Sequence, residues 1–244
     1  MLHGPQRALL ATPDTGWGTA YDQKVLTYAP TAYWPLDELT GVAVLDRSGT
    51  GLPDGTNTGA TVGQPGIGDG ATSYLFDGLN DYVNVFSPAL AAVFDGAEGS
   101  ILAWVKVFNA GVWSDGQYRY AIYPNVGVND YWNVARSTGA GRMLDRIASG
   151  GVSKSSNLAT GSPLGFVMHT LTVSETADEF KIYWDATPKA THNGLGNFVN
   201  PITAFLIGAA SGAPVWVWYG YIAKVAYWAG TILQQADITD LATV

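Results

Sequence analysis

The sequence predicts an all-β protein in which antiparallel sheets form a two-sheet sandwich or a barrel. Short runs of strand length, rich in β-branched and aromatic residues, follow one another along most of the chain. Segments of turn chemistry, rich in Gly, Asn, Asp and Ser, separate these runs. No helical pattern alternates with them, which favours a sandwich or barrel over a parallel sheet.

A mobile arm and a short helix are expected before the first strand. Residues 1–19 contain two prolines and three glycines, so we expect an extended N-terminal arm that needs a partner, such as a neighbouring subunit, to hold it still. The spacing of Tyr21, Val25 and Tyr28, ended by Pro30, predicts one or two turns of helix. Residues 20–244 are expected to form one domain.

Most of this domain is expected to be strand, with a second short helix at the C-terminal end. The expected strands lie within 32–38, 41–49, 73–78, 81–87, 100–108, 118–128, 131–137, 165–175, 179–186, 204–210 and 213–228. The spacing of Leu233, Ala236 and Leu241 predicts the C-terminal helix.

The run 213–228 does not alternate apolar and polar residues. Val215, Val217 and Tyr219 have one parity, and Trp216 and Trp218 have the other. This run is therefore either a core strand covered on both faces or a strand with an exposed aromatic platform for a sugar, a partner chain or a membrane.

Composition and charge exclude several classes of function. The net charge is −8, and the 12 basic residues form no run, so duplex nucleic acid and anionic membrane surfaces are disfavoured as ligands. The absence of cysteine excludes disulfides, thiolate catalysis and Cys-based zinc sites. The longest apolar patch near the N-terminus, "ALLA", is too short for a Sec signal peptide.

Only 13% of residues are charged, whereas ordinary domains have roughly 25%. With 9 Trp and 13 Tyr, this composition indicates a surface covered by partners, or else a glycine-rich sandwich that has few charges by chance.

Several blocks in order along the chain resemble one family. They are "YDQKVLTYAPTAYWPLDELTGVAVLDRSG", "SYLFDGLNDYVNV", "GSILAWVKV", "FVMHTLTVSETADEFKIYWDATPKA", "FLIGAA" and "WYGYIAKVAYWAGTILQQADITDLA". Together they are similar to the laminin-G-like or concanavalin A-like jelly-roll modules of bacteria and their viruses. The resemblance implies a jelly roll of two curved antiparallel sheets, with the closing strand beside the N-terminal strand. A β-bulge near Ala223 and Lys224 would place Ile222 and Val225 on one face.

The resemblance also suggests a calcium site, but this sequence lacks the acidic residue on which that site depends. Some members hold calcium with an acidic residue after the isoleucine that corresponds to Ile222, but here Ala223 and then Lys224 follow. Calcium needs six or more oxygen ligands, and a lysine would oppose it, so we expect no calcium there. The family's common Asp-Gly turn is replaced by Asp185 and Ala186, which predicts a different turn.

A second, weaker metal candidate is the turn that contains Asp77, Asn80 and Asp81. Side chains of this kind in a turn more often bind their own backbone, which is the reading we favour.

Catalysis is not expected. Glucan-cleaving relatives carry a Glu-x-Asp-x-Glu strand, which is missing here, and Glu175, Asp178 and Glu179 fall in an expected turn. No Gly-x-Ser-x-Gly elbow occurs, and the three histidines do not have the spacing of metal ligands.

Aromatic residues are the candidate binding groups, for carbohydrate or for a protein partner. These two ligands are not distinguished by residue type. The candidates are Trp113, Tyr118, Tyr120, Tyr131, Trp132, Trp216 and Trp218, with Tyr123 nearby and Asp115, Gln117, Asn129 and Asp130 available for hydroxyl groups.

The sequence favours a non-catalytic structural or adhesive protein, a virion component of a bacteriophage held to other subunits through its N-terminal arm. Such a protein would be made in the cytoplasm and reside in a virion or at an extracellular surface. The alternative is a free carbohydrate-binding, lectin-like module that recognises a cell-surface glycan, and a glycoside hydrolase ranks third.

Overall fold

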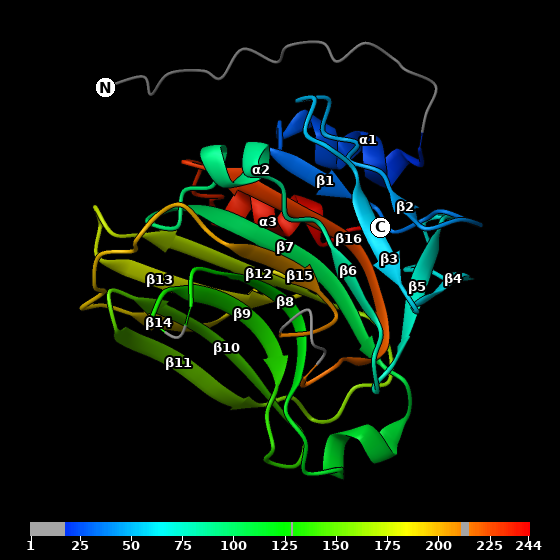
Figure 1. The fold of residues 1–244 in the computed structure, drawn as a ribbon. Helices are drawn as coiled ribbons and strands as arrows, with labels where there is room; N and C mark the ends of the chain where they lie inside the picture. Colours follow the sequence, from blue (N-terminus) through cyan, green and yellow to red (C-terminus); the bar gives the residue numbers. More distant parts are fainter. Residues whose placement is uncertain (1–17, 128, 211–214) are drawn as a thin grey trace.

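Two antiparallel sheets of eight strands each stack face to face in the computed structural model, which describes residues 18–127, 129–210 and 215–244 (Figure 1). Residues 1–17 of the predicted arm lie outside the described residues. The prediction of an all-β, two-sheet antiparallel jelly-roll sandwich with short helices near both ends is confirmed.

Sheet A lies under the terminal helices. In spatial order it contains β14 (Thr187–His192), β13 (Glu179–Trp184), β12 (Val167–Ser174), β7 (Glu98–Val107), β16 (Tyr219–Ala229), β5 (Thr72–Asp77) and β4 (Thr61–Pro65), and β1 (Ala32–Trp34) pairs with β16. The first and last strands of the chain are therefore neighbours, as the resemblance implies.

Sheet B forms the other layer. Its order is β11 (Val152–Ala159), β10 (Arg142–Ser149), β9 (Tyr131–Arg136), β8 (Arg119–Asn125), β15 (Ala204–Ile207), β6 (Tyr82–Asn84), β3 (Gly55–Thr58) and β2 (Ala43–Val44).

Short helices occupy the ends of the chain and one inter-strand connection. Helix α1 spans Ala20–Thr27 with a capping box between Thr19 and Asp22, and α3 spans Gln235–Leu241. The sequence analysis did not expect α2, Pro88–Val93, although Ser87 caps it and Pro88 occupies its first turn. A 3₁₀ turn, η1, covers Ala110–Ser114. None of the helices in the described residues is long and apolar enough to span a bilayer.

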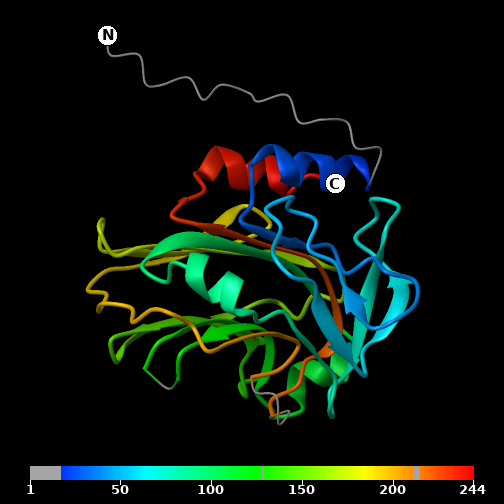
Figure 2. The same ribbon diagram turned by 45° about the horizontal axis from the view of Figure 1, so that its top comes forward.

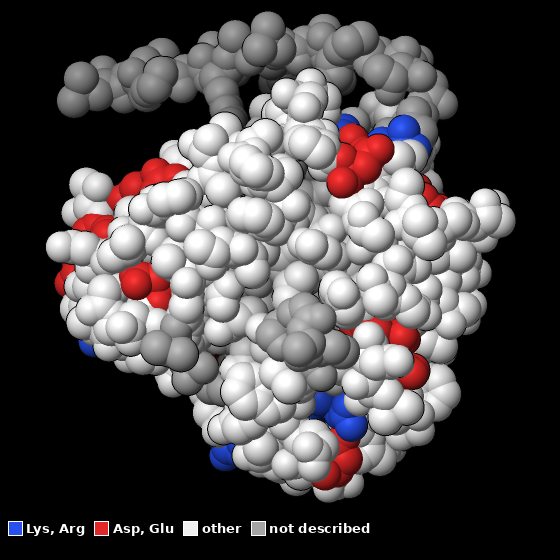
Figure 3. Space-filling model, in the orientation of Figure 1, with Lys and Arg blue, Asp and Glu red and all other residues white. Residues whose placement is uncertain are grey.

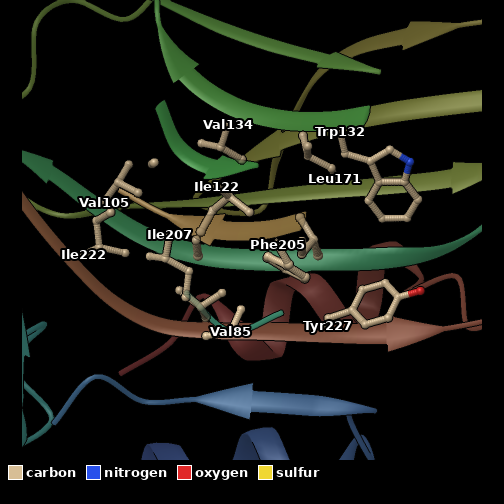
Figure 4. Close-up of a cluster of buried hydrophobic side chains, with 14 of the residues drawn as sticks. Val85, Val105, Ile122, Trp132, Val134, Leu171, Phe205, Ile207, Ile222 and Tyr227 are labelled. Atoms are coloured by element: carbon tan, nitrogen blue, oxygen red, sulfur yellow. The ribbon is translucent and has the colours of Figure 1, made fainter. Parts of the chain in front are cut away.

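The main core fills the space between the sheets. Leu171, Ile222 and Tyr227 of sheet A face Trp132 and Phe205 of sheet B (Figure 4). Phe94, which follows α2, stacks on Tyr227 with ring centroids 4.6 Å apart. This packing removes large aromatic surfaces from water, which is the main favourable term in folding.

A second core explains the apolar run near the C-terminus. Helices α1 and α3 lie on the outer face of sheet A (Figure 2). They bury Leu102 and Trp104 of β7 and Ala226 and Trp228 of β16. The central strands β7 and β16 are therefore covered on both faces, which removes the need for polar alternation.

The predicted bulge in β16 is confirmed. The pairing of β16 with β7 shifts between Ala223 and Ala226, and Ile222 and Val225 both point into the inter-sheet core. Lys224 has a left-handed backbone with φ of 54° at this bulge.

Lys224 is a buried cation under α1. Its Nζ lies 2.5 Å from Oδ1 of Asp22 in α1 and 2.9 Å from Oδ2 of Asp69 in the β4–β5 connection. The Tyr33 hydroxyl donates to Asp22 Oδ1 as well, at 2.5 Å. Burial alone would raise the pKa of Asp22, but the Lys224 ammonium and these hydrogen bonds hold that pKa below its ordinary value.

The expectation of an altered turn between β13 and β14 is wrong. Asp185 and Ala186 have φ of 45° and 62°, and Trp184 pairs directly with Thr187, so the turn is a two-residue hairpin of the kind that Asp-Gly forms. The Asp185 carboxylate accepts from the Met168 N–H at 2.8 Å, which stabilises this turn without glycine.

We expect Lys224→Met to lower the free energy of unfolding by roughly 3–5 kcal/mol, because it leaves two buried carboxylates without their cation. Urea denaturation measures this change. Lys181→Met is the matched control, since Lys181 meets Glu179 at 2.7 Å with both side chains more than a third exposed, and it should cost less than about 1 kcal/mol. Equal losses for the two variants would contradict a structural role for the buried ammonium.

The free energy of unfolding should fall in acid partly through Asp22. Its folded pKa is depressed, so its stabilising contribution is complete above the ordinary carboxyl value near about 4 and is lost as pH falls toward the folded pKa. Burial raises the pKa of Asp37, which acts in the opposite direction. Urea denaturation between about pH 6 and 2 should therefore show a shallower acid loss for Asp22→Asn than for the parent chain, and identical slopes would refute the assignment.

Candidate functional site

Aromatic side chains gather on the outer face of sheet B, the face not covered by the terminal helices. Tyr120 and Tyr123 come from β8, Tyr131 from β9, Tyr118 from the segment before β8, and Trp216 from the β15–β16 connection. We call these five residues the aromatic face.

Strand parity brings the tyrosines to this face. On β9, Trp132 and Val134 lie in the core, and Tyr131, which has the opposite parity, therefore points to the outer face. On β8 the pairing with β9 shifts between Tyr120 and Ile122, which allows Ile122 to enter the core while Tyr120 packs outside beside Ala135.

The five rings form one continuous row. Trp216 stacks on Tyr120 with centroids 5.3 Å apart and planes 20° apart, and Tyr118 meets Trp216 edge-on at 5.9 Å. Tyr120 contacts Tyr123 at 5.2 Å, and Tyr123 contacts Tyr131 at 5.5 Å. Distances of this size are those of favourable aromatic pairs.

The rings of the row differ in solvent exposure. Tyr120 and Tyr131 are 3% and 6% exposed, whereas Trp216 is 48% exposed. The Trp216 indole therefore presents an open surface while a packed tyrosine holds the ring from behind.

The backbone around Trp216 is held in a defined conformation. Trp216 has φ of 55°, a left-handed value that is unfavourable for a residue of its size. Its carbonyl accepts from the Tyr120 N–H at 2.7 Å. Arg119 Nη1 donates to the Val217 carbonyl at 3.0 Å. Strain maintained by surrounding contacts is typical of binding sites, because it fixes the contact group before the ligand arrives.

Hydroxyl and amide groups flank the aromatic face on β11. Ser153, Ser155 and Asn157 are exposed. The strand register puts them on the same face as Tyr131 and Ala135, two strands away. Strand spacing places these polar groups roughly 10 Å from β9.

Two acidic residues expected to bind hydroxyl groups are instead used within the protein. Asp115 pairs with Arg119 Nε and Arg136 Nη1, both at 2.7 Å. Asp130 Oδ1 accepts from the Gly150 and Val199 N–H groups at 2.7 and 3.0 Å. Both carboxylates therefore stabilise loops near the aromatic face.

The seven aromatic candidates separate into two groups. Tyr118, Tyr120, Tyr131 and Trp216 lie together on the aromatic face. Trp113, Trp132 and Trp218 lie in the inter-sheet core, where they cannot contact a ligand on the outer face. Sequence alone did not separate them because Trp113 lies in η1 and Trp216 and Trp218 lie in the connection before β16, where strand parity does not apply. The register shift in β8 also changes the face that Tyr120 occupies.

The residues around Lys224 do not fit a calcium ion. Ala223 offers no side-chain oxygen, and the Lys224 ammonium already neutralises Asp22 and Asp69 at 2.5 and 2.9 Å. A hard cation would have to displace this ammonium and then find six or more oxygens.

The turn 77–81 uses its carboxylates on its own backbone. Asp77 Oδ1 accepts from the Leu79 and Asn80 N–H groups, and Asp81 Oδ2 accepts from the Asp77 N–H at 2.8 Å. Across the described ranges, no cluster of three His, Asp or Glu side chains could hold a metal. That the protein binds no calcium stays a prediction.

Comparisons of sequence identify no relative of this chain. No protein-family model matches it, and no curated protein matches it.

Comparison of structure shows a shared β-sandwich fold. Domain 4 of an extracellular arabinanase from Geobacillus stearothermophilus, solved with arabinotriose, has a TM-score of 0.65 and 17% identity over 88% of this chain and 98% of that one. The receptor binding domain of a botulinum neurotoxin C/D mosaic has a TM-score of 0.69 and 12% identity over 88% of this chain and 51% of that one. The Trypanosoma rangeli sialidase solved with sialic acid has a TM-score of 0.63 and 10% identity over 88% of this chain and 33% of that one. The chain thus spans about half the length of the neurotoxin domains it resembles.

Calcium should leave the thermal midpoint of unfolding unchanged, because the Lys224 ammonium occupies the position that a cation would need. Differential scanning calorimetry in excess calcium and in EDTA tests this. A midpoint that rises with calcium concentration would show that a site exists despite Lys224.

Proposed function

We propose that this protein is a non-catalytic carbohydrate-binding module that holds a glycan on its aromatic face. The observation that carries the proposal is the half-exposed Trp216 ring, stacked 5.3 Å from Tyr120 and fixed by a left-handed backbone. A sugar ring presents apolar C–H groups on one side, and these pack against the face of an indole.

The polar surroundings suit a short chain of sugars rather than a single ring. If one sugar of an oligosaccharide packs on Trp216, the adjoining sugars would lie along the aromatic face toward Ser153, Ser155 and Asn157. Hydroxyl and amide side chains both donate and accept, as sugar hydroxyls require. The net charge of −8 disfavours an acidic glycan, and most of the surface seen in Figure 3 is uncharged, which together favour a neutral glycan.

The structural neighbours support this proposal through the ligands named for them. The arabinanase domain was solved with arabinotriose, and a botulinum neurotoxin serotype D ligand binding domain was solved with N-acetylneuraminic acid. Folds host many functions, so the argument depends on the aromatic face of this chain.

A structural role in a larger assembly, such as a bacteriophage virion, is the second candidate. Its support is the low charge of the chain and the exposure of Leu39, Val42 and Leu79, each more than 60% open to solvent. Hydrolysis of a glycan ranks below both. Glu175 accepts from the Phe198 N–H, and Asp178 accepts from the Gly194 and Leu195 N–H groups, so these carboxylates serve the backbone.

We expect the protein to bind a subset of neutral oligosaccharides on a glycan array, and Trp216→Ala to weaken that binding at least about tenfold, equal to roughly 1.4 kcal/mol. Isothermal titration calorimetry with the best array ligand measures the loss. Phe108→Ala is the matched control, since Phe108 is 41% exposed and stacks on Tyr219 at 4.8 Å outside the aromatic face.

Two results would overturn the proposal. One is a parent chain that binds nothing on the array, and the other is equal binding by Trp216→Ala and Phe108→Ala.

A further inference from the structure

A cavity lies between the two sheets, away from the aromatic face. Its volume is about 200 Å³. Its walls include Trp113 of η1, Trp184 of β13, Trp218 of the β15–β16 connection, Met143 of β10 and Val105 of β7. Aromatic and aliphatic groups on several sides make a cavity that favours an apolar ring.

The cavity also has a polar group at depth. His169 of β12 lines it and is 1% exposed. Its Nδ1 lies 3.2 Å from Oδ2 of Asp145, a fully buried carboxylate that also accepts from Trp184 Nε1 at 2.8 Å. The contact with Asp145 fixes the orientation of the imidazole.

Several polar atoms of residues in or beside the cavity lining have no hydrogen-bond partner within the described residues. Nε2 of His169 makes no hydrogen bond within the described residues, and neither do the buried Trp218 Nε1 and Asp145 Oδ1. Buried polar atoms without partners are costly, so a ligand that satisfies one of them gains affinity beyond apolar contact.

The opening of the cavity differs from its interior. Asp185, Thr187 and Lys189 of the β13–β14 hairpin line it and are exposed, whereas Met143 and Trp218 are each 1% exposed. Lys189 Nζ lies 5.3 Å from the Trp184 ring, at this open end. A ligand would therefore enter past the hairpin and meet His169 inside.

We propose that this cavity binds a small aromatic ring carrying one hydroxyl group, of the phenol class, with the ring among the three tryptophans and the hydroxyl on His169 Nε2. A hydroxyl donates and accepts, so it pairs with Nε2 in the neutral and in the protonated imidazole. A sugar is disfavoured because the polar side chains of the lining other than His169 are exposed or half-exposed, so hydroxyl groups held among the three tryptophans would lose water without gaining a partner. The proposal is independent of glycan binding on the aromatic face.

The methionines offer a direct probe, because Met143 lines the cavity while Met168 lies in the core under α1 and α3. The protein is labelled with ¹³C at the methionine methyl groups, the signals are assigned with Met143→Leu and Met168→Leu, and phenol, benzene or glucose is titrated. Phenol should shift the Met143 signal in a saturable way and leave the Met168 signal in place. Benzene should bind roughly fivefold more weakly, since it lacks the hydroxyl, and glucose should shift neither signal.

Three variants locate the ligand. Thr187→Trp places a large side chain at the exposed opening and should abolish the phenol shift without altering the core. His169→Phe should remove the preference for phenol over benzene; if this variant fails to fold, the phenol-to-benzene ratio in the parent chain and the Thr187→Trp result still decide. Trp216→Ala should leave phenol binding unchanged.

The proposal is overturned if phenol does not shift Met143, if it shifts Met143 and Met168 alike, or if benzene or glucose binds as well as phenol. Phenol binding that survives Thr187→Trp would overturn it as well.

Discussion

The buried ammonium of Lys224 connects parts of the chain that are far apart in sequence. It lies between Asp22 of the first helix and Asp69 of the β4–β5 connection, and it projects from the bulge of the last strand. Three buried charges are costly unless their geometry is good, and here short contacts and the Tyr33 hydroxyl satisfy Asp22. The arrangement positions α1 on sheet A. Because α1 and α3 then cover that sheet, β7 and β16 can be apolar on both faces.

This coverage makes the two outer faces of the sandwich different. Sheet A is enclosed by helices, whereas sheet B carries rings and hydroxyl groups on its outer side. Several low-identity neighbours share the fold, so the sandwich is a scaffold and recognition depends on the side chains placed on it. In this chain the outer face of sheet B carries Trp216, supported by Tyr120, and the space between the sheets contains His169, oriented by Asp145.

The two candidate sites use the same physical device, which is a contact group held in place by buried neighbours. Trp216 is supported by Tyr120 and by the hydrogen bond from the Tyr120 N–H to its carbonyl. His169 is oriented by Asp145, which Trp184 in turn holds. A group positioned before the ligand arrives loses little entropy on binding, so even a small site can be selective.

The sequence by itself determined the all-β class, the two terminal helices, the bulge after Ile222 and the set of aromatic residues from which the candidate face is drawn. The class, the helices and the aromatic set follow from local pattern and composition, which act over a few residues, whereas the bulge was expected from the family resemblance and the parity of the run around Ile222. Tertiary structure alone decided that Trp216 is presented while Trp113, Trp132 and Trp218 are buried, that Asp185 and Ala186 form a glycine-free hairpin turn, and that Lys224 meets Asp22 and Asp69. The physical reason is that these features depend on contacts between segments distant in sequence: packing fixes the conformation of turns and connections, and a register shift between strands decides which face a side chain occupies.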